Sequence, residues 1–94
     1  MISIIIPTYN EEKRVLHTLC DLVKVLNSKD HEIIVADADS KDNTVKVVEN
    51  FAGAQENKIK IKIIKFDERI GRGLSLSKII KNTHSEIVVY IDAD

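Results

Sequence analysis

The chain has 94 residues, a formal net charge of −1, and 44% apolar against 31% charged residues. This balance is typical of one small globular domain and excludes an intrinsically disordered chain. The near-neutral charge excludes a nucleic-acid partner held by bulk electrostatic attraction. Because Cys20 is the only cysteine, no internal disulfide can form, and we expect a reducing, cytoplasmic compartment.

The first predicted element is a strand over residues 2–6, a β-branched apolar run that ends at Pro7. This run is too short for a signal peptide or a membrane span. Apolar residues then recur at helical spacing and predict an amphipathic helix to about Asn27. We expect Asn10 to be the N-cap of this helix.

The second strand is predicted over residues 33–36, and a second amphipathic helix follows it. Ser40 or Asp42 is the expected cap of that helix, because both side chains accept hydrogen bonds from backbone N–H groups. Gly53 is the expected stop, since glycine readily adopts the left-handed conformation that ends many helices.

Residues 59–66 alternate isoleucine with lysine in their first half, which predicts an edge strand with one buried face and one charged face. A short third helix is predicted over residues 74–82. Residues 86–91 then form a continuously apolar fourth strand, of the kind found in the centre of a parallel sheet.

Alternation of strands and helices predicts an α/β fold, a Rossmann-like parallel sheet of about four strands with helices on both faces. The order that fits is 3-2-1-4, with the lysine-rich third strand outermost. The apolar fourth strand would be the other edge. We therefore expect further residues or a second copy to cover it, which would make the chain a homo-oligomer in the second case.

Parallel strands end at one edge of a sheet, and ligands of such sheets bind there. Every predicted strand here is followed by polar residues, and two of them by the sequence Asp-Ala-Asp. These two segments begin at Asp37 and Asp92, on strands that flank the first strand, so they lie about 10 Å apart. A nucleoside diphosphate can bridge that gap, with its base and ribose near Asp37 and its phosphates near Asp94.

Asp92 and Asp94 follow the fourth strand with one small residue between them. Side chains alternate along a strand, so both carboxylates can lean to the same side. Carboxylate oxygens are hard ligands that suit Mg²⁺ or Mn²⁺, especially where the metal also holds phosphates. The chain stops at this motif, and we expect residues 1–94 to be a subdomain that is truncated at its active site.

Four segments together resemble the donor-binding half of family 2 glycosyltransferases, which have the GT-A fold. They are Pro7-Thr8-Tyr9-Asn10-Glu11, Asp37 to Thr44, Gly71-Arg72-Gly73 and Asp92-Ala93-Asp94. The dolichyl-phosphate mannose and glucose synthases are the most similar group. The resemblance implies a metal-dependent transfer from a UDP- or GDP-sugar to an acceptor hydroxyl or a lipid phosphate such as polyprenyl phosphate, normally with inversion.

The resemblance also implies roles for individual residues. The base and ribose pocket would be lined by Pro7, Thr8, Tyr9 and Glu11. Apart from the resemblance, Arg72 or Arg69 is a candidate contact for the diphosphate, because guanidinium groups pair with phosphate oxygens. Asp92 and Ala93 would contact the donor, with Asp92 on the ribose or a metal-bound water, and Asp94 would ligate the metal.

The sequence departs from the family pattern after the second strand, where the family has Asp-Asp-Gly-Ser. Here the residues are Asp37-Ala38-Asp39-Ser40. The first aspartate is kept, so Asp37 is the best candidate for the base and ribose contact. Asp39 occupies the position of the glycine, and it could replace the carboxylate lost at Ala38.

The resemblance places the family's catalytic base beyond Asp94, so the 94-residue chain alone is expected to transfer no sugar. The full-length protein would work in the cytoplasm, at the cytoplasmic face of a membrane if its acceptor is a lipid. The residues leave two alternatives open. One is a magnesium-dependent phosphoryl-transfer domain that uses Glu11 or Glu12 with Asp92 and Asp94. The other is a non-catalytic nucleotide-binding or self-associating half-domain. A dinucleotide-binding oxidoreductase is excluded, because no Gly-x-Gly-x-x-Gly follows the first strand.

Overall fold

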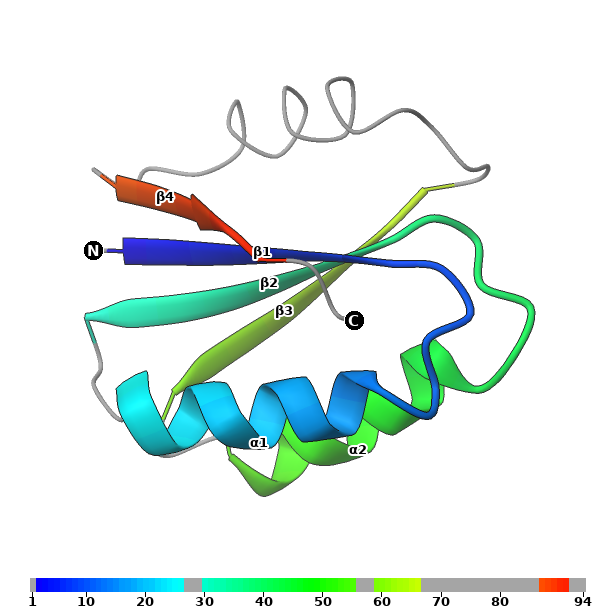
Figure 1. Ribbon diagram of the computed structural model, residues 1–94, viewed down its shortest axis with the longest axis horizontal. Helices are drawn as coiled ribbons and strands as arrows, with labels where there is room; N and C mark the ends of the chain where they lie inside the picture. The colour runs from blue at the N-terminus through cyan, green and yellow to red at the C-terminus, as the bar shows by residue number, and fades with distance from the viewer. Residues whose placement is uncertain (1, 27–29, 56–58, 67–86, 92–94) are drawn as a thin grey trace.

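The computed structural model of the chain describes residues 2–26, 30–55, 59–66 and 87–91. Within these ranges it has an α/β fold of four strands and two helices (Figure 1). In chain order they are β1 (Ile2–Thr8), α1 (Val15–Leu26), β2 (His31–Asp37), α2 (Thr44–Ala54), β3 (Lys60–Lys65) and β4 (Ile87–Tyr90). No helix in the described ranges is both long enough and apolar enough to cross a membrane.

All strand pairs in the sheet are parallel, and the order is β3-β2-β1-β4. This is the order expected from the sequence. The pairing of β1 with β2 sets Ile2 opposite His31 at one end and Thr8 opposite Asp37 at the other. The carboxyl ends of these two central strands therefore meet at one edge of the sheet.

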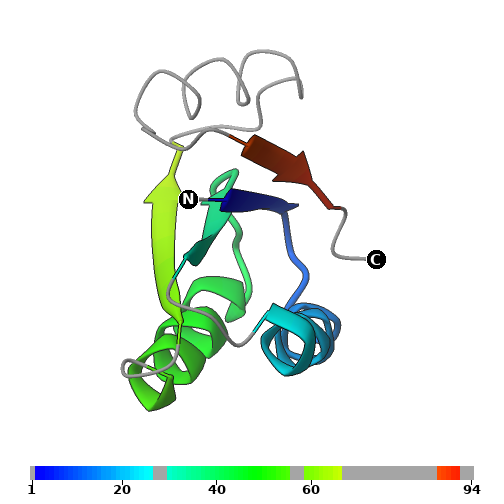
Figure 2. The ribbon, with the colours of Figure 1, turned by 90° about the vertical axis from the view of Figure 1, so that its left-hand side faces the viewer.

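Both α1 and α2 lie on the same face of the sheet (Figures 1 and 2). Successive strands β1, β2 and β3 are added in one direction, so right-handed crossovers place both helices on one side. The core on this face consists of buried apolar residues from the sheet and the helices, among them Ile4, Ile6, Val15, Leu19, Ile33, Val35 and Val48. The predicted third helix, and with it a helix on the other face, lies outside the described residues.

The opposite face of the sheet is also buried at its centre, where Ile5, Ile34 and Phe66 form a second apolar cluster. Near the start of the strands this face carries a buried carboxylate, Glu32, which accepts a 2.8 Å hydrogen bond from the Ser3 hydroxyl. Lys62 lies 3.5 Å from the same carboxylate. A sheet with both faces buried explains why β1 and β2 are continuously apolar rather than alternating.

The lysine-rich edge is confirmed, because β3 is outermost and its lysines, including Lys60 and Lys62, are exposed. Ile61 and Ile63 pack against the helix-side core, as expected from the alternation. The pattern changes at Ile64, which packs against the cluster on the other face.

Three predicted boundaries were wrong. β1 continues through Pro7 to Thr8, because the fixed φ of proline is compatible with extended backbone. α1 begins at Val15, after a turn in which the N–H of Val15 donates to the Glu11 carbonyl at 2.9 Å, so Asn10 is not its N-cap. α2 passes through Gly53 and ends at Ala54.

Gly53 is not a helix stop because it has no positive φ. The last turn of α2 is closed instead by a 3.1 Å hydrogen bond from the Gln55 N–H to the Ala52 carbonyl. That bond satisfies an orphan carbonyl of the helix end without any left-handed residue.

Truncation of Leu19 to alanine tests the packing of α1 on the sheet. Leu19 is fully buried, so Leu19→Ala should lower the free energy of unfolding by about 2–5 kcal/mol through lost burial and a residual cavity. Leu16 lies on the same helix and is 44% exposed, so Leu16→Ala should cost less than about 1 kcal/mol. Urea unfolding followed by circular dichroism measures both, and equal losses would contradict the placement of the helix.

Candidate functional site

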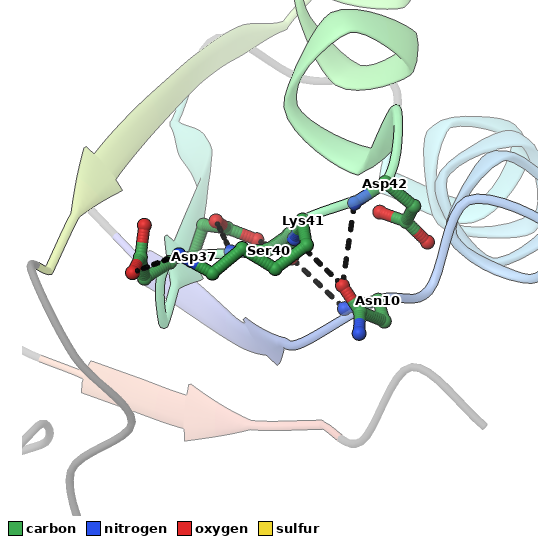
Figure 3. A network of polar contacts seen from close by, with 6 residues as sticks. Asn10, Asp37, Ser40, Lys41 and Asp42 are labelled. Carbon is green, nitrogen blue, oxygen red and sulfur yellow. Dashed lines mark hydrogen bonds and ion pairs between the residues drawn. The ribbon is translucent and has the colours of Figure 1, made fainter.

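Two loops meet at the carboxyl ends of β1 and β2, and they carry most of the polar residues singled out in the sequence. The first covers residues 9–14 and leads into α1, and the second covers residues 38–43 and leads into α2. Parallel pairing of the strands sets the loops side by side (Figure 3). The Ala38 N–H donates to the Thr8 carbonyl at 2.9 Å, which extends the ladder into the loops.

Asp37 ends β2 and is only 1% exposed. One carboxylate oxygen accepts hydrogen bonds from the Thr8 hydroxyl at 2.7 Å and the Ser40 hydroxyl at 2.5 Å. The other accepts from the Ser40 backbone N–H at 2.9 Å. A buried carboxylate needs such donors, because an unpaired charge away from water is very costly. Asp37 thus joins the end of β1 to the turn that follows β2.

Asn10 joins the two loops from the other side (Figure 3). Its backbone N–H donates to the Ser40 hydroxyl at 2.9 Å. Its side-chain oxygen accepts from the backbone N–H of Lys41 at 2.8 Å and, more weakly, of Asp42 at 3.4 Å. Asn10 has a φ of 52°, a left-handed conformation that asparagine tolerates better than most residues.

A second set of hydrogen bonds connects the segments that lead into the two helices. The Glu11 N–H donates to the Thr44 hydroxyl at 2.8 Å, and the Glu12 N–H donates to Asp42 at 3.3 Å. Asp42 also accepts from the Thr44 N–H at 2.9 Å and from the Thr44 hydroxyl. The N-cap of α2 is Asn43, which makes no side-chain cap hydrogen bond, so the expectation of Ser40 or Asp42 at that position was wrong. Asp42 binds the first residue of α2 from one position earlier, and Ser40 binds Asp37 instead.

These hydrogen bonds determine the charge state of Asp42. Burial opposes ionisation, but the hydrogen bonds from the Thr44 hydroxyl and from the N–H groups of Thr44 and Glu12 outweigh it and lower the pKa of Asp42. Close by, the hydrogen bond and the charge of Asp39 raise the pKa of Lys41, whose ammonium lies 2.8 Å from the Asp39 carboxylate. Both side chains are thus ionised near neutral pH.

Beside the first loop the surface has a hollow of about 240 Å³. It is lined by Asn10, Glu11, Glu12, Lys13, Arg14 and Asp42. The lining offers carboxylate acceptors and cationic donors, and Arg14 lies 3.8 Å from Glu11. The volume is below that of a pocket for a drug-sized ligand, so the hollow suits one small polar group.

The structure brings together six of the residues expected in the site. Thr8 and Asp37 are buried and hydrogen-bonded to each other, whereas Pro7, Tyr9, Glu11 and Asp39 are half-buried around the same strand ends. Arg72, Asp92, Ala93 and Asp94 lie outside the described residues, so the diphosphate contact and the metal pair stay predictions. Within the described ranges, no three His, Cys, Asp or Glu side chains gather closely enough to hold a metal.

Sequence reasoning missed the role of Asn10, which it assigned as a helix cap. The available signal was the residue type, because asparagine both tolerates left-handed backbone and offers a side-chain oxygen to nearby N–H groups. The sequence did not reveal that those N–H groups belong to a loop about thirty residues away, as the bonds from Lys41 and Asp42 show.

Acid should weaken the fold partly through Asp42. Its pKa is lowered from 3.8, so its contribution to stability is present above the unfolded-state value and is lost as pH falls through the folded-state value. Asp42→Asn should cost about 1–2 kcal/mol at pH 7, and this cost should shrink as the pH is lowered below 3.8. Urea unfolding over a series of pH values measures the cost, and a cost that stays constant in acid would contradict the role of the charge.

The backbone at Asp39 gives a separate prediction. Its φ is 60°, a conformation that glycine adopts freely and alanine does not. Asp39→Gly and Asp39→Ala both remove the exposed ion pair with Lys41, so their difference isolates the backbone. The glycine variant should be more stable than the alanine variant by about 1–2 kcal/mol in urea unfolding. An alanine variant of equal or higher stability would show that the turn is not left-handed.

The sequence of the chain matches known proteins along almost its full length. The pattern of Glycosyl transferase family 2 matches residues 3–94. The chain is 32% identical over 100 residues to a dolichyl-phosphate beta-glucosyltransferase of Dictyostelium discoideum, covering 99% of this chain and 30% of that protein. It is also 32% identical over 94 residues to a poly(ribitol-phosphate) beta-N-acetylglucosaminyltransferase, TarS, of Staphylococcus aureus, covering 98% of this chain and 16% of that protein.

Solved structures show the same fold. A mannosyltransferase from Pyrobaculum calidifontis in complex with GDP-Man and Mn²⁺ has a TM-score of 0.90 at 29% identity, over 99% of this chain and 27% of that one. TarS in complex with UDP-GlcNAc has a TM-score of 0.80 at 28% identity, over 99% of this chain and 26% of that one. The α/β arrangement is thus of the GT-A type, and the chain spans about a third or less of the length of these relatives.

The parallel sheet, the polar loops at its carboxyl edge and the family match over residues 3–94 agree with one another. The chain belongs to glycosyltransferase family 2.

Proposed function

We propose that this chain is the nucleotide-sugar-binding region of an enzyme that transfers a sugar from a UDP- or GDP-sugar to an acceptor. The observation that carries the proposal is the pair of cross-linked loops at the carboxyl ends of β1 and β2, in a chain of family 2. Ligands of open parallel sheets bind at this edge. Complexes of similar proteins with GDP-Man and with UDP-GlcNAc support a nucleotide-sugar as the ligand.

The described residues that can meet the nucleotide are the half-buried ones around the two loops, Tyr9, Glu11 and Asp39, with Pro7 at the end of β1. The Tyr9 ring offers a flat apolar surface with a polar end, which suits a base. The Glu11 carboxylate can accept hydrogen bonds from ribose hydroxyls. Thr8 and Asp37 lie deeper in the same wall.

The metal end of the proposed site would lie after β4. That strand runs parallel to β1, and the Ile91 N–H donates to the Ile5 carbonyl at 2.9 Å, so β4 leads toward the edge where the loops lie. Asp92 and Asp94 follow at once in the sequence and offer hard oxygen ligands for Mg²⁺ or Mn²⁺. Mn²⁺ is present with nucleotide-sugars in two similar structures, from Pyrobaculum calidifontis and Mycobacterium tuberculosis.

When bound, the metal would neutralise the charge that grows on the departing diphosphate. Arg72 would add a cation near the same oxygens. The acceptor, a hydroxyl or a lipid phosphate such as polyprenyl phosphate, would attack the anomeric carbon with inversion. Its general base is proposed to lie beyond Asp94, and the reaction to take place in the cytoplasm or at the cytoplasmic face of a membrane.

A self-associating half-domain is a second candidate, and one observation favours it. In the described sheet β4 pairs with β1 only, so its outer side is an edge, and Val89 on that strand is 39% exposed. An apolar edge of this kind can pair with a second copy. This candidate does not account for the loops at the strand ends.

Calorimetric titration of the chain with UDP and with GDP, each with Mn²⁺, tests the donor site. We expect binding of at least one nucleotide, and a loss of affinity of about tenfold or more in Asp94→Ala, because a lost carboxylate ligand weakens the metal. Asp21→Ala is the matched control, because it also removes a carboxylate, but one that is 60% exposed on α1 and lies outside the proposed site. A folded chain that binds neither nucleotide, or equal affinities in the two variants, would contradict the proposal.

A further inference from the structure

The Asp37 carboxylate already accepts hydrogen bonds from other groups of the protein. Three hydrogen bonds of 2.5 to 2.9 Å reach it, from the hydroxyls of Thr8 and Ser40 and from the Ser40 N–H. A carboxylate has about four acceptor positions, so little of its capacity remains. With the residue 1% exposed, a nucleotide would have to displace one of these donors to touch it.

The three donors come from both sides of the site. Thr8 ends β1, whereas Ser40 belongs to the turn after β2. Figure 3 shows Asp37 and Ser40 on one side of the hydrogen bonds that connect the two loops, and Asn10 on the other side. Ser40 uses its hydroxyl twice, because it donates to Asp37 and accepts the Asn10 N–H at 2.9 Å.

This arrangement links the buried carboxylate to the exposed loop. The Ser40 hydroxyl fixes the position of the Asn10 backbone, because it accepts the Asn10 N–H. The Asn10 side-chain oxygen in turn accepts the Lys41 N–H at 2.8 Å. Asn10 is in a left-handed conformation, which asparagine tolerates better than most residues and which the surrounding contacts stabilise here. Its neighbours in the chain are Tyr9 and Glu11, so the direction of both depends on this turn.

We propose that Asp37 is a positioning residue, which holds the loop of Tyr9, Asn10 and Glu11 against the loop of Ser40 and Lys41 without touching the nucleotide. The inference rests on the proposed donor site for its functional part. It replaces the direct base and ribose contact that the sequence suggested for Asp37. The nucleotide is then contacted by the half-buried side chains, whose orientation depends on the hydrogen bonds between Asp37, Ser40 and Asn10.

Amide hydrogen exchange in the absence of nucleotide tests the structural part. Asp37→Asn keeps the size of the side chain but replaces one carboxylate oxygen with an NH₂ group, which cannot accept the hydrogen bonds that now reach that oxygen. We expect exchange at the Asn10, Ser40 and Lys41 amides to rise about tenfold or more, as for the loss of one hydrogen bond each. Asp39→Asn is the matched control in the same turn, and it should change these rates by less than about twofold, because the Asp39 carboxylate pairs with the exposed Lys41 ammonium. Unchanged exchange at Asn10 and Lys41 in Asp37→Asn would overturn the proposal.

Ser40→Ala decides the matter if Asp37→Asn does not fold. It removes the relaying hydroxyl and keeps the carboxylate and the bond to it from the backbone N–H of residue 40. We expect faster exchange at the Asn10 amide, with the amide of residue 40 still protected. Equal protection of the Asn10 amide in the wild type and in this variant would show that these hydrogen bonds do not hold the loop.

Nucleotide affinities test the functional part, with UDP, GDP and 2′-deoxy-UDP titrated in the presence of Mn²⁺. A positioning role predicts that Asp37→Asn weakens the binding of all three nucleotides by a similar factor. The ratios of their affinities should then stay within about twofold of the wild-type ratios. A change of about tenfold in any ratio would reveal a direct contact with the base or the ribose. If the wild-type chain binds none of them, the proposed function fails, and the exchange rates alone decide whether Asp37 positions the loops.

Discussion

The parallel pairing of β1 with β2 is the constraint on which the rest of the site depends. It sets Thr8 opposite Asp37 at the last rung of the ladder, so a hydroxyl and a carboxylate meet where both strands stop. From that point the two loops cannot separate without breaking a charge-assisted hydrogen bond in a buried environment. A slip of the register by one residue would turn Asp37 to the other face of the sheet.

The loops are held by polar contacts rather than by an apolar core, and this has a cost that is visible in the backbone. Asn10 and Asp39 are both left-handed, at φ values of 52° and 60°, although neither is glycine. Such strain persists only where neighbouring bonds determine the conformation. At Asn10 those bonds are the contacts with Ser40 and Lys41, whereas the exposed ion pair of Asp39 with Lys41 lies within a single turn. The geometry at Asn10 is therefore a joint property of two segments about thirty residues apart.

The sequence predicted the fold well because its signals were periodic and local. The lysine alternation identified β3 as an edge, and the apolar runs identified β1 and β2 as central strands. The site was predicted only in its location. The predicted strand ends indicated which residues gather at the edge of the sheet. They did not indicate that Asp37 is buried or that the Asn10 side chain accepts a hydrogen bond from Lys41. Gly53 shows the same limit at a helix end, because a bond from Gln55 to Ala52 made a glycine stop unnecessary.

The two outer strands of the described sheet differ in a way that limits how it can grow. β3 presents Lys60, Lys62 and Lys65, whereas β4, with the sequence Ile-Val-Val-Tyr, carries no charge at all. Charged side chains on an edge strand disfavour pairing, so such a sheet is extended more readily from the neutral side. If two copies met through β4, the joined sheet would end in lysines on both outer edges. Its assembly would then stop at a closed pair and would not continue into a filament.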